Sequence, residues 1–156
     1  MHKDMEDFVD GLQAEIDEAV RREMGEAVYQ RWRNPLYMGV LPDFDATASV
    51  RGNCGDQMQI YLKFLKNRVI KASFQTDGCG PSVVAASYAA ELALGKSAEE
   101  LFSLDPEHIL AATGGLPEDH EHCAFLAIET LHAAARNWLE ARRTPNKATA
   151  QQGSVA

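Results

Sequence analysis

Two neighbouring stretches of the chain alternate apolar and polar residues with a period of two, as expected of strands with one buried face. The short polar run Lys66-Asn67-Arg68 separates them and predicts an antiparallel hairpin. A third, shorter strand is predicted over 47–51. The apolar positions are Met58, Ile60, Leu62 and Phe64 in one stretch and Ile70, Ala72 and Phe74 in the other.

Apolar residues recur every three or four positions on both sides of these strands, and this spacing predicts helices. The first predicted helix covers 5 to about 31 and ends before Asn34-Pro35, since a residue before proline avoids helical angles. Further helices are predicted over 81–94, 97–102, 105–113 and 119–142. A sheet with one polar face covers its other face with helices. The fold class is therefore α+β, a three-stranded antiparallel sheet packed on a layer of helices.

The N-terminal 23 residues form an amphipathic helical extension with many acidic side chains. We expect this extra N-terminal helix to lie on the domain with its polar face in solvent; a helix that docks on a partner is the alternative. The domain itself spans 24–142. Residues 143–156 are mostly small and polar, which predicts a disordered tail.

Composition narrows the possible partners. With 46% hydrophobic and 24% charged residues, the chain of 156 residues is typical of one globular domain. The formal charge of -8 and the lack of a Lys/Arg cluster argue against a nucleic-acid partner. No signal peptide and no apolar run of about 20 residues is present, so we expect no membrane partner and a cytoplasmic location.

All three cysteines lie in short segments rich in glycine, aspartate or histidine. In a reducing compartment, an odd cysteine count favours metal or redox chemistry over disulfides. The first cysteine ends a strand, the second joins a strand to a helix, and the third is in the first turn of the last helix. Such positions can converge at one edge, where helix dipoles stabilise thiolates. The segments are Gly52-Asn53-Cys54-Gly55-Asp56, Asp77-Gly78-Cys79-Gly80 and His120-Glu121-His122-Cys123.

The number of thiols limits the chemistry of such a site. A [2Fe-2S] cluster normally takes four cysteine thiolates, and this chain supplies three. Asp56 or His122 would therefore be the fourth ligand, and the sequence leaves that choice open. Zn(II) also accepts three sulfurs and one such donor. The plainer alternative is three unrelated cysteines, one or two of them buried.

Taken together, these segments resemble the U-type iron-sulfur cluster assembly scaffolds, the family of IscU and the N-terminal domain of NifU. The resemblance runs from about Met24 to Arg142 and includes the spacing of the three cysteines. Its points are Asn34-Pro35, Gly52-Asn53-Cys54-Gly55-Asp56, Thr76-Asp77-Gly78-Cys79-Gly80, Gly95-Lys96-Ser97, Leu116-Pro117 and His122-Cys123.

This resemblance implies a scaffold rather than an enzyme. Such a protein receives sulfur from a cysteine desulfurase and iron from an iron donor, builds a [2Fe-2S] cluster and transfers it to apo iron-sulfur proteins. Carried over by position, Cys54, Cys79 and Cys123 are cluster ligands, and Cys123 is the persulfide acceptor. Asp56 and His122 serve iron binding or the fourth position. Zinc is possible in the cluster-free protein, and the chain is a monomer or a homodimer.

One segment departs from the family pattern, and two other functions are possible for such a site. Where relatives carry Leu-Pro-Pro-Val-Lys, this chain has Leu116-Pro117-Glu118-Asp119-His120, which argues against recognition by a dedicated Hsp70-type chaperone. A zinc-dependent sulfur acceptor of the SufU type is the first alternative, although the insertion that marks that branch is missing. The second is an interaction domain in which zinc only stabilises the fold.

Overall fold

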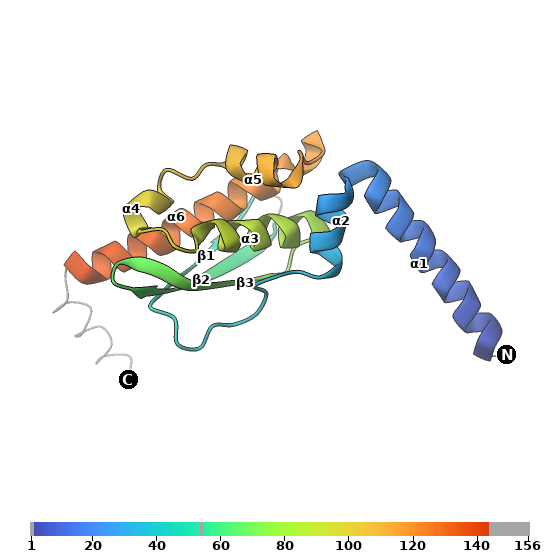
Figure 1. Ribbon diagram of the computed structural model, residues 1–156, viewed down its shortest axis with the longest axis horizontal. Coiled ribbons are helices and arrows are strands. Elements are labelled where there is room, and N and C mark those ends of the chain that lie inside the picture. Colours follow the sequence, from blue (N-terminus) through green and yellow to red (C-terminus); the bar gives the residue numbers. More distant parts are fainter. Residues whose placement is uncertain (1, 54, 144–156) are drawn as a thin grey trace.

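Three antiparallel strands in the order β1-β2-β3 form the centre of the computed structural model, which describes residues 2–53 and 55–143. They are β1 (Ala46–Arg51), β2 (Gln57–Leu65) and β3 (Arg68–Thr76). Two long helices cover one face: α6 (Glu121–Arg143) packs on β1 and β2, and α3 (Gly80–Ala93) packs on β3 and α6. Figure 1 shows this helical layer above the sheet. The predicted α+β class is confirmed.

The β2–β3 hairpin turns at Lys66 and Asn67, whose φ angles of 52° and 67° fit a two-residue turn of the type that matches strand twist. The register then shifts between Lys63 and Phe64, because Phe64 pairs with Val69 while Lys63 pairs with Lys71. This irregularity leaves Ile70 outside the pairing. The prediction that Ile70 shares the buried face is therefore wrong: Val69 is buried and Ile70 is 43% exposed.

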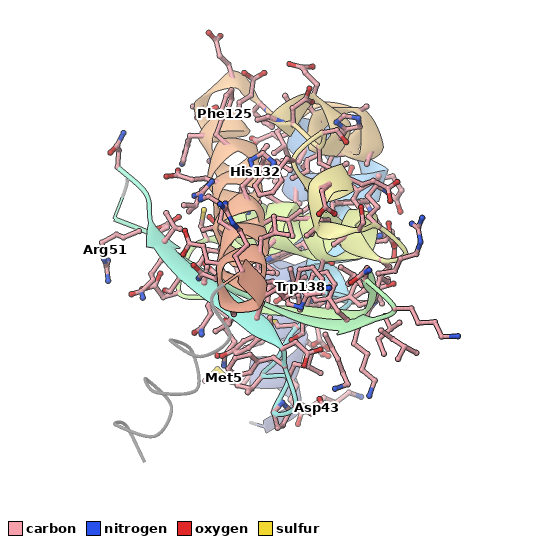
Figure 2. The ribbon with its side chains drawn as sticks, turned by 90° about the vertical axis from the view of Figure 1, so that its left-hand side faces the viewer. Met5, Asp43, Arg51, Phe125, His132 and Trp138 are labelled. Atoms are coloured by element: carbon pink, nitrogen blue, oxygen red, sulfur yellow. The ribbon has the colours of Figure 1, made fainter. Side chains whose placement is uncertain are left out.

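The core lies between the sheet and the two long helices, and it contains the four β2 residues predicted from the alternation. Met58, Ile60 and Leu62 have no exposed surface, and Phe64 stacks on Trp138 of α6 with ring centroids 4.0 Å apart. Figure 2 shows Trp138 on α6 together with His132 and Phe125. Small residues such as Ala89 and Ala127 are fully buried on α3 and α6, which lets these helices approach closely.

The N-terminal region differs from its prediction. It forms two helices, α1 (His2–Met24) and α2 (Glu26–Arg33), because Gly25 adopts φ 89° and interrupts the helix. α2 packs on α3, whereas α1 extends away from the sheet-and-helix domain (Figure 1). The expectation that this helix lies on the domain is therefore wrong for most of its length. The apolar side chains of its first turns are exposed by 45–65%, namely Met5, Phe8, Val9, Leu12 and Ile16.

Three short helical segments connect α3 to α6. They are α4 (Ala98–Leu101), α5 (Pro106–Thr113) and a 3-10 turn at Glu118–His120. A capping box between Ser97 and Glu100 starts α4, as its sequence predicts. Of the tail predicted over 143–156, Arg143 is the last residue of α6, and 144–156 lie outside the described residues. Within the described ranges, none of the helices combines the length and apolar character needed to cross a bilayer.

Candidate metal site at the starts of α3 and α6

The loop between β1 and β2 is a tight turn that presents Asp56. The Gly52 N–H donates to the Asp56 carbonyl at 2.8 Å, and the Gly55 N–H donates to the Gly52 carbonyl at 3.0 Å. Gly55 has φ 92°, a left-handed angle at which a side chain is unfavourable. The Arg51 guanidinium donates to the Gly55 carbonyl at 2.5 Å and to Gln57 Oε1 at 2.8 Å. The turn is therefore held at both ends. Cys54, which stands between Asn53 and Gly55 in the sequence, is outside the described residues.

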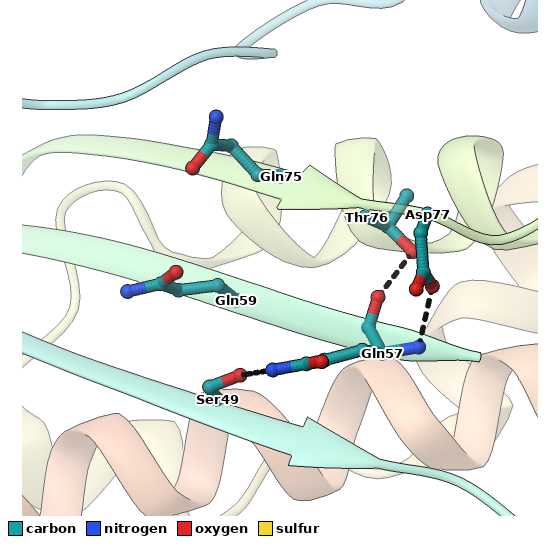
Figure 3. A pocket seen from close by; sticks show the side chains of 6 residues that line it. All are labelled: Ser49, Gln57, Gln59, Gln75, Thr76 and Asp77. Atoms are coloured by element: carbon teal, nitrogen blue, oxygen red, sulfur yellow. Dashed lines mark hydrogen bonds between the residues drawn. The ribbon is translucent and has the colours of Figure 1, made fainter. Parts of the chain in front are cut away.

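The segment after β3 is hydrogen-bonded to the residue that follows this turn. Asp77 Oδ1 accepts from the Gln57 N–H at 2.7 Å, and the Thr76 hydroxyl donates to the Gln57 carbonyl at 2.7 Å. Figure 3 shows both bonds at the end of the sheet, beside a polar pocket on the face opposite the helices. These bonds fix the distance between the first and second cysteine segments.

Cys79 is the N-cap of α3, as predicted from the strand-to-helix junction. Its carbonyl accepts from the Ser82 and Val83 N–H groups at 3.0 and 3.1 Å. Its side chain is exposed. The sulfur of Cys79 is therefore at the N-terminus of α3, on the solvent-exposed side of the first turn.

The strongest contacts between segments run through Ser82, which the sequence analysis did not identify. Its hydroxyl donates to Asp56 Oδ2 at 2.9 Å and lies 3.4 Å from Cys123 Sγ. Cys123 is fully buried in the first turn of α6, and its sulfur lies 3.6 Å from His122 Nε2. The structure therefore brings Asp56, His122 and Cys123 together, with Ser82 between the carboxylate and the sulfur.

Glycines beside these residues leave the space that the contacts need. A Cβ on Gly78 would lie 2.7 Å from Asp56 Oδ2 and from the Ser82 side chain. A Cβ on Gly80 would lie 3.0 Å from the indole of Trp32. The glycines on either side of Cys79 thus permit close packing.

A cavity of about 420 Å³ opens next to the β1–β2 turn. It is lined by Gly52, Asn53, His122, Phe125, Leu126 and Glu129. Phe125, one of the lining residues, is 59% exposed and lies on α6 (Figure 2). This side of the site is therefore open to solvent, whereas Cys123 is fully buried.

The described residues account for part of the expected ligand set. Asp56, His122 and Cys123 are linked by the contacts described above, and Cys79 is three residues before Ser82 at the start of the same helix. Among residues 2–53 and 55–143, no group of three or more His, Cys, Asp or Glu side chains is arranged to hold a metal ion. The expected ligand Cys54 lies outside these ranges, so the complete set stays a prediction.

These features define a class of domain, an α+β sandwich with a thiol and carboxylate site at the helix starts. Residues 23–145 match the family model described as the NifU-like N-terminal domain, so the chain belongs to that family. The chain is 38% identical over 111 residues to the iron-sulfur cluster assembly scaffold protein IscU 1 of Archaeoglobus fulgidus, covering 70% of this chain and 72% of the relative. It is 36% identical over 121 residues to IscU of Aquifex aeolicus, also named a scaffold protein, with 75% and 76% covered.

Solved structures support the fold. An N-terminal NifU-like protein from Brucella abortus superposes with a TM-score of 0.61 at 19% identity, covering 78% of this chain and 97% of that one. A scaffold protein for the SUF system from Fervidobacterium islandicum superposes with a TM-score of 0.59 at 16% identity, covering 74% and 98%. At these identities the likeness concerns the fold alone, and it confirms the predicted sheet-and-helix sandwich.

Proposed function

We propose that this protein is a scaffold on which an iron-sulfur cluster is assembled and from which it is transferred to apo-proteins. The observation that carries the proposal is the contact of Asp56, Ser82, Cys123 and His122 beside the Cys79 helix cap. The names of the relatives, as scaffold proteins of iron-sulfur cluster assembly, support the same role. The cluster is cargo, which the protein holds for a time and then releases.

The donor set suits a [2Fe-2S] cluster. Cys54, Cys79 and Cys123 supply three thiolates, and Asp56 or His122 supplies the fourth donor. His122 is adjacent to Cys123 in the first turn of α6, and Asp56 reaches the same sulfur through Ser82. An oxygen or nitrogen donor in place of a fourth thiolate makes the cluster easier to displace, which is consistent with transfer.

Sulfur would come from a cysteine desulfurase as a persulfide. The Cys123 thiolate attacks the outer sulfur of the desulfurase persulfide and forms a new S–S bond, while the desulfurase cysteine leaves as a thiolate. No oxidant is needed. Because Cys123 is fully buried, this reaction requires the surrounding chain to move and expose the sulfur. The exposed Cys79 is the alternative acceptor.

Anaerobic purification followed by metal and sulfide analysis tests this function. Iron with acid-labile sulfide supports the scaffold. Stoichiometric zinc with stimulation of a desulfurase would instead favour a SufU-like sulfur acceptor, and zinc that changes only the melting temperature would favour a structural role. Mass spectrometry of Cys79→Ser and Cys123→Ser after incubation with a desulfurase identifies the acceptor. A Cys123→Ser protein that still accepted persulfide would overturn the assignment of Cys123.

A further inference from the structure

Ser82 is a fully buried hydroxyl between a carboxylate and a thiol. It lies in the first turn of α3, three residues after Cys79, and has no exposed surface. Its Oγ is 2.9 Å from Asp56 Oδ2 and 3.4 Å from Cys123 Sγ. A buried hydroxyl needs polar partners, and both of these partners are proposed ligands.

The position of this hydroxyl is determined by its surroundings. The Ser82 N–H donates to the Cys79 carbonyl at 3.0 Å, which ties its backbone to the helix cap. The Cα of Gly78 lies so close that a Cβ there would be 2.7 Å from Ser82 Oγ. Ser82 therefore contacts the Cys79 cap by its backbone and both Asp56 and Cys123 by its side chain.

The chemistry of a hydroxyl suits this position. Serine has one hydrogen to donate and two lone pairs that accept, so it can donate to the Asp56 carboxylate and accept from the Cys123 thiol at once. It thereby keeps the Asp56 oxygen and the Cys123 sulfur in fixed positions before a metal ion binds. Alanine would keep the helix but leave the carboxylate without this bond.

We propose that Ser82 is a positioning residue that prearranges Asp56 and Cys123 for metal binding. This inference rests on the proposed function, because it assumes that these two side chains bind iron. Residues that orient metal ligands without touching the metal typically change the affinity by about 10- to 100-fold when removed. Ser82→Ala is therefore expected to weaken metal binding by about tenfold or more.

Ser87→Ala is the matched control. Ser87 is also a fully buried serine of α3, and its hydroxyl donates to the Leu36 carbonyl at 2.8 Å and accepts from Arg31 at 3.0 Å. Its removal costs the same kind of buried hydrogen bond at a distance from the site. Ser82→Thr retains a hydroxyl and serves as the conservative variant.

Anaerobic titration of the full chain with Co²⁺ measures the affinity, because thiolate bound to cobalt gives charge-transfer absorption. We expect the unsubstituted protein and Ser87→Ala to bind alike, Ser82→Ala to bind about tenfold more weakly, and Ser82→Thr to bind more tightly than Ser82→Ala. Equal affinities for Ser82→Ala and Ser87→Ala, with both proteins less stable to heat, would assign Ser82 a packing role and overturn the inference.

The same titration separates this inference from the proposed function. If the unsubstituted protein shows no thiolate charge-transfer bands, or if their intensity is unchanged in Cys123→Ser, the proposed site itself is wrong. If the bands depend on Cys123 while Ser82→Ala binds as tightly as the unsubstituted protein, only the role of Ser82 is wrong.

Discussion

A Cβ atom on Gly78 would lie 2.7 Å from Asp56 Oδ2, closer than side-chain carbons pack. It would also lie 2.7 Å from the Cβ of Ser82, which is attached to the α3 backbone and cannot swing aside. The glycine before Cys79 thus determines how closely the β1–β2 turn approaches the start of α3. Its role is steric, since a positive φ is not what requires it.

Gly78→Ala should therefore displace Asp56. We expect a loss of about 1 to 3 kcal/mol in the free energy of unfolding, the usual cost of overpacking, together with weaker Co²⁺ binding. Urea denaturation and cobalt titration measure the two effects. Gly11→Ala is the control, because a Cβ at Gly11 meets nothing within 4 Å. Stability and affinity that are unchanged in Gly78→Ala would show that the site is not packed as described.

Asp77→Ala should loosen the connection between the cysteine segments. Its Oδ1 accepts from the Gln57 N–H at 2.7 Å, and removing that acceptor should cost about 1 kcal/mol. Amide hydrogen exchange is the direct measurement, and the Gln57 amide should exchange about fivefold faster. Asp43→Ala, which removes an exposed ion pair with Lys63, should leave the Gln57 amide unchanged. Equal protection of Gln57 in both variants would contradict the role of Asp77.

Arg31 joins α2 to α3 by three contacts. Its guanidinium donates to Ser87 Oγ at 3.0 Å and to Glu91 Oε1 at 3.2 Å, and it lies 3.9 Å from the centroid of the Tyr88 ring. Lysine cannot reproduce this flat, forked geometry, so Arg31→Lys should lower the free energy of unfolding by about 1 to 2 kcal/mol. Urea denaturation measures this change in the free energy of unfolding. Arg33→Lys, at an exposed position, should change stability by less than about 0.5 kcal/mol. Equal effects of the two substitutions would contradict this account.

Removal of residues 2–18 should leave the domain stable. The apolar side chains of this part of α1, such as Phe8 and Ile16, are 45–65% exposed and bury little surface. We expect a change below about 0.5 kcal/mol in thermal or urea denaturation. Val28→Ala, which empties a buried position of α2, should cost about 2 kcal/mol by comparison. A truncated chain that lost more stability than Val28→Ala would mean that α1 packs on the domain after all.

The alternation of residues predicted the sheet well, because the local pattern of apolar residues decides which face of each strand packs on the helices. Met58, Ile60 and Leu62 follow it without exception. Ile70 is the exception. The register shift beside the hairpin turn depends on how β3 pairs with β2, and the residue pattern of β3 alone does not show it. The sequence predicted one helix through Gly25, because glycine is tolerated inside helices. Only the φ of 89° at Gly25 shows that the helix is interrupted there.

The candidate site was predictable where the residue type itself indicates chemistry. Cysteine, aspartate and histidine identified the segments around Asp56, Cys79 and Cys123, and the structure places those segments together. Ser82 lies within the predicted helix 81–94, and its residue type alone did not mark it as part of a site. Its position three residues after a capping cysteine turns it inward, but which side chains it meets depends on tertiary packing of β1, α3 and α6. The spacing of residues in the sequence therefore does not predict the contact of Ser82 with Asp56 and Cys123.

Transfer of an assembled cluster to an apo-ferredoxin tests the central claim most directly. The protein is loaded anaerobically with iron and sulfide, freed of excess reagents and mixed with apo-ferredoxin, and the two proteins are then separated and analysed for iron and sulfide. The proposed function predicts that iron and sulfide leave the scaffold together and appear as a cluster in the ferredoxin. A loaded protein that kept its cluster under these conditions, or that never bound iron and sulfide, would contradict it.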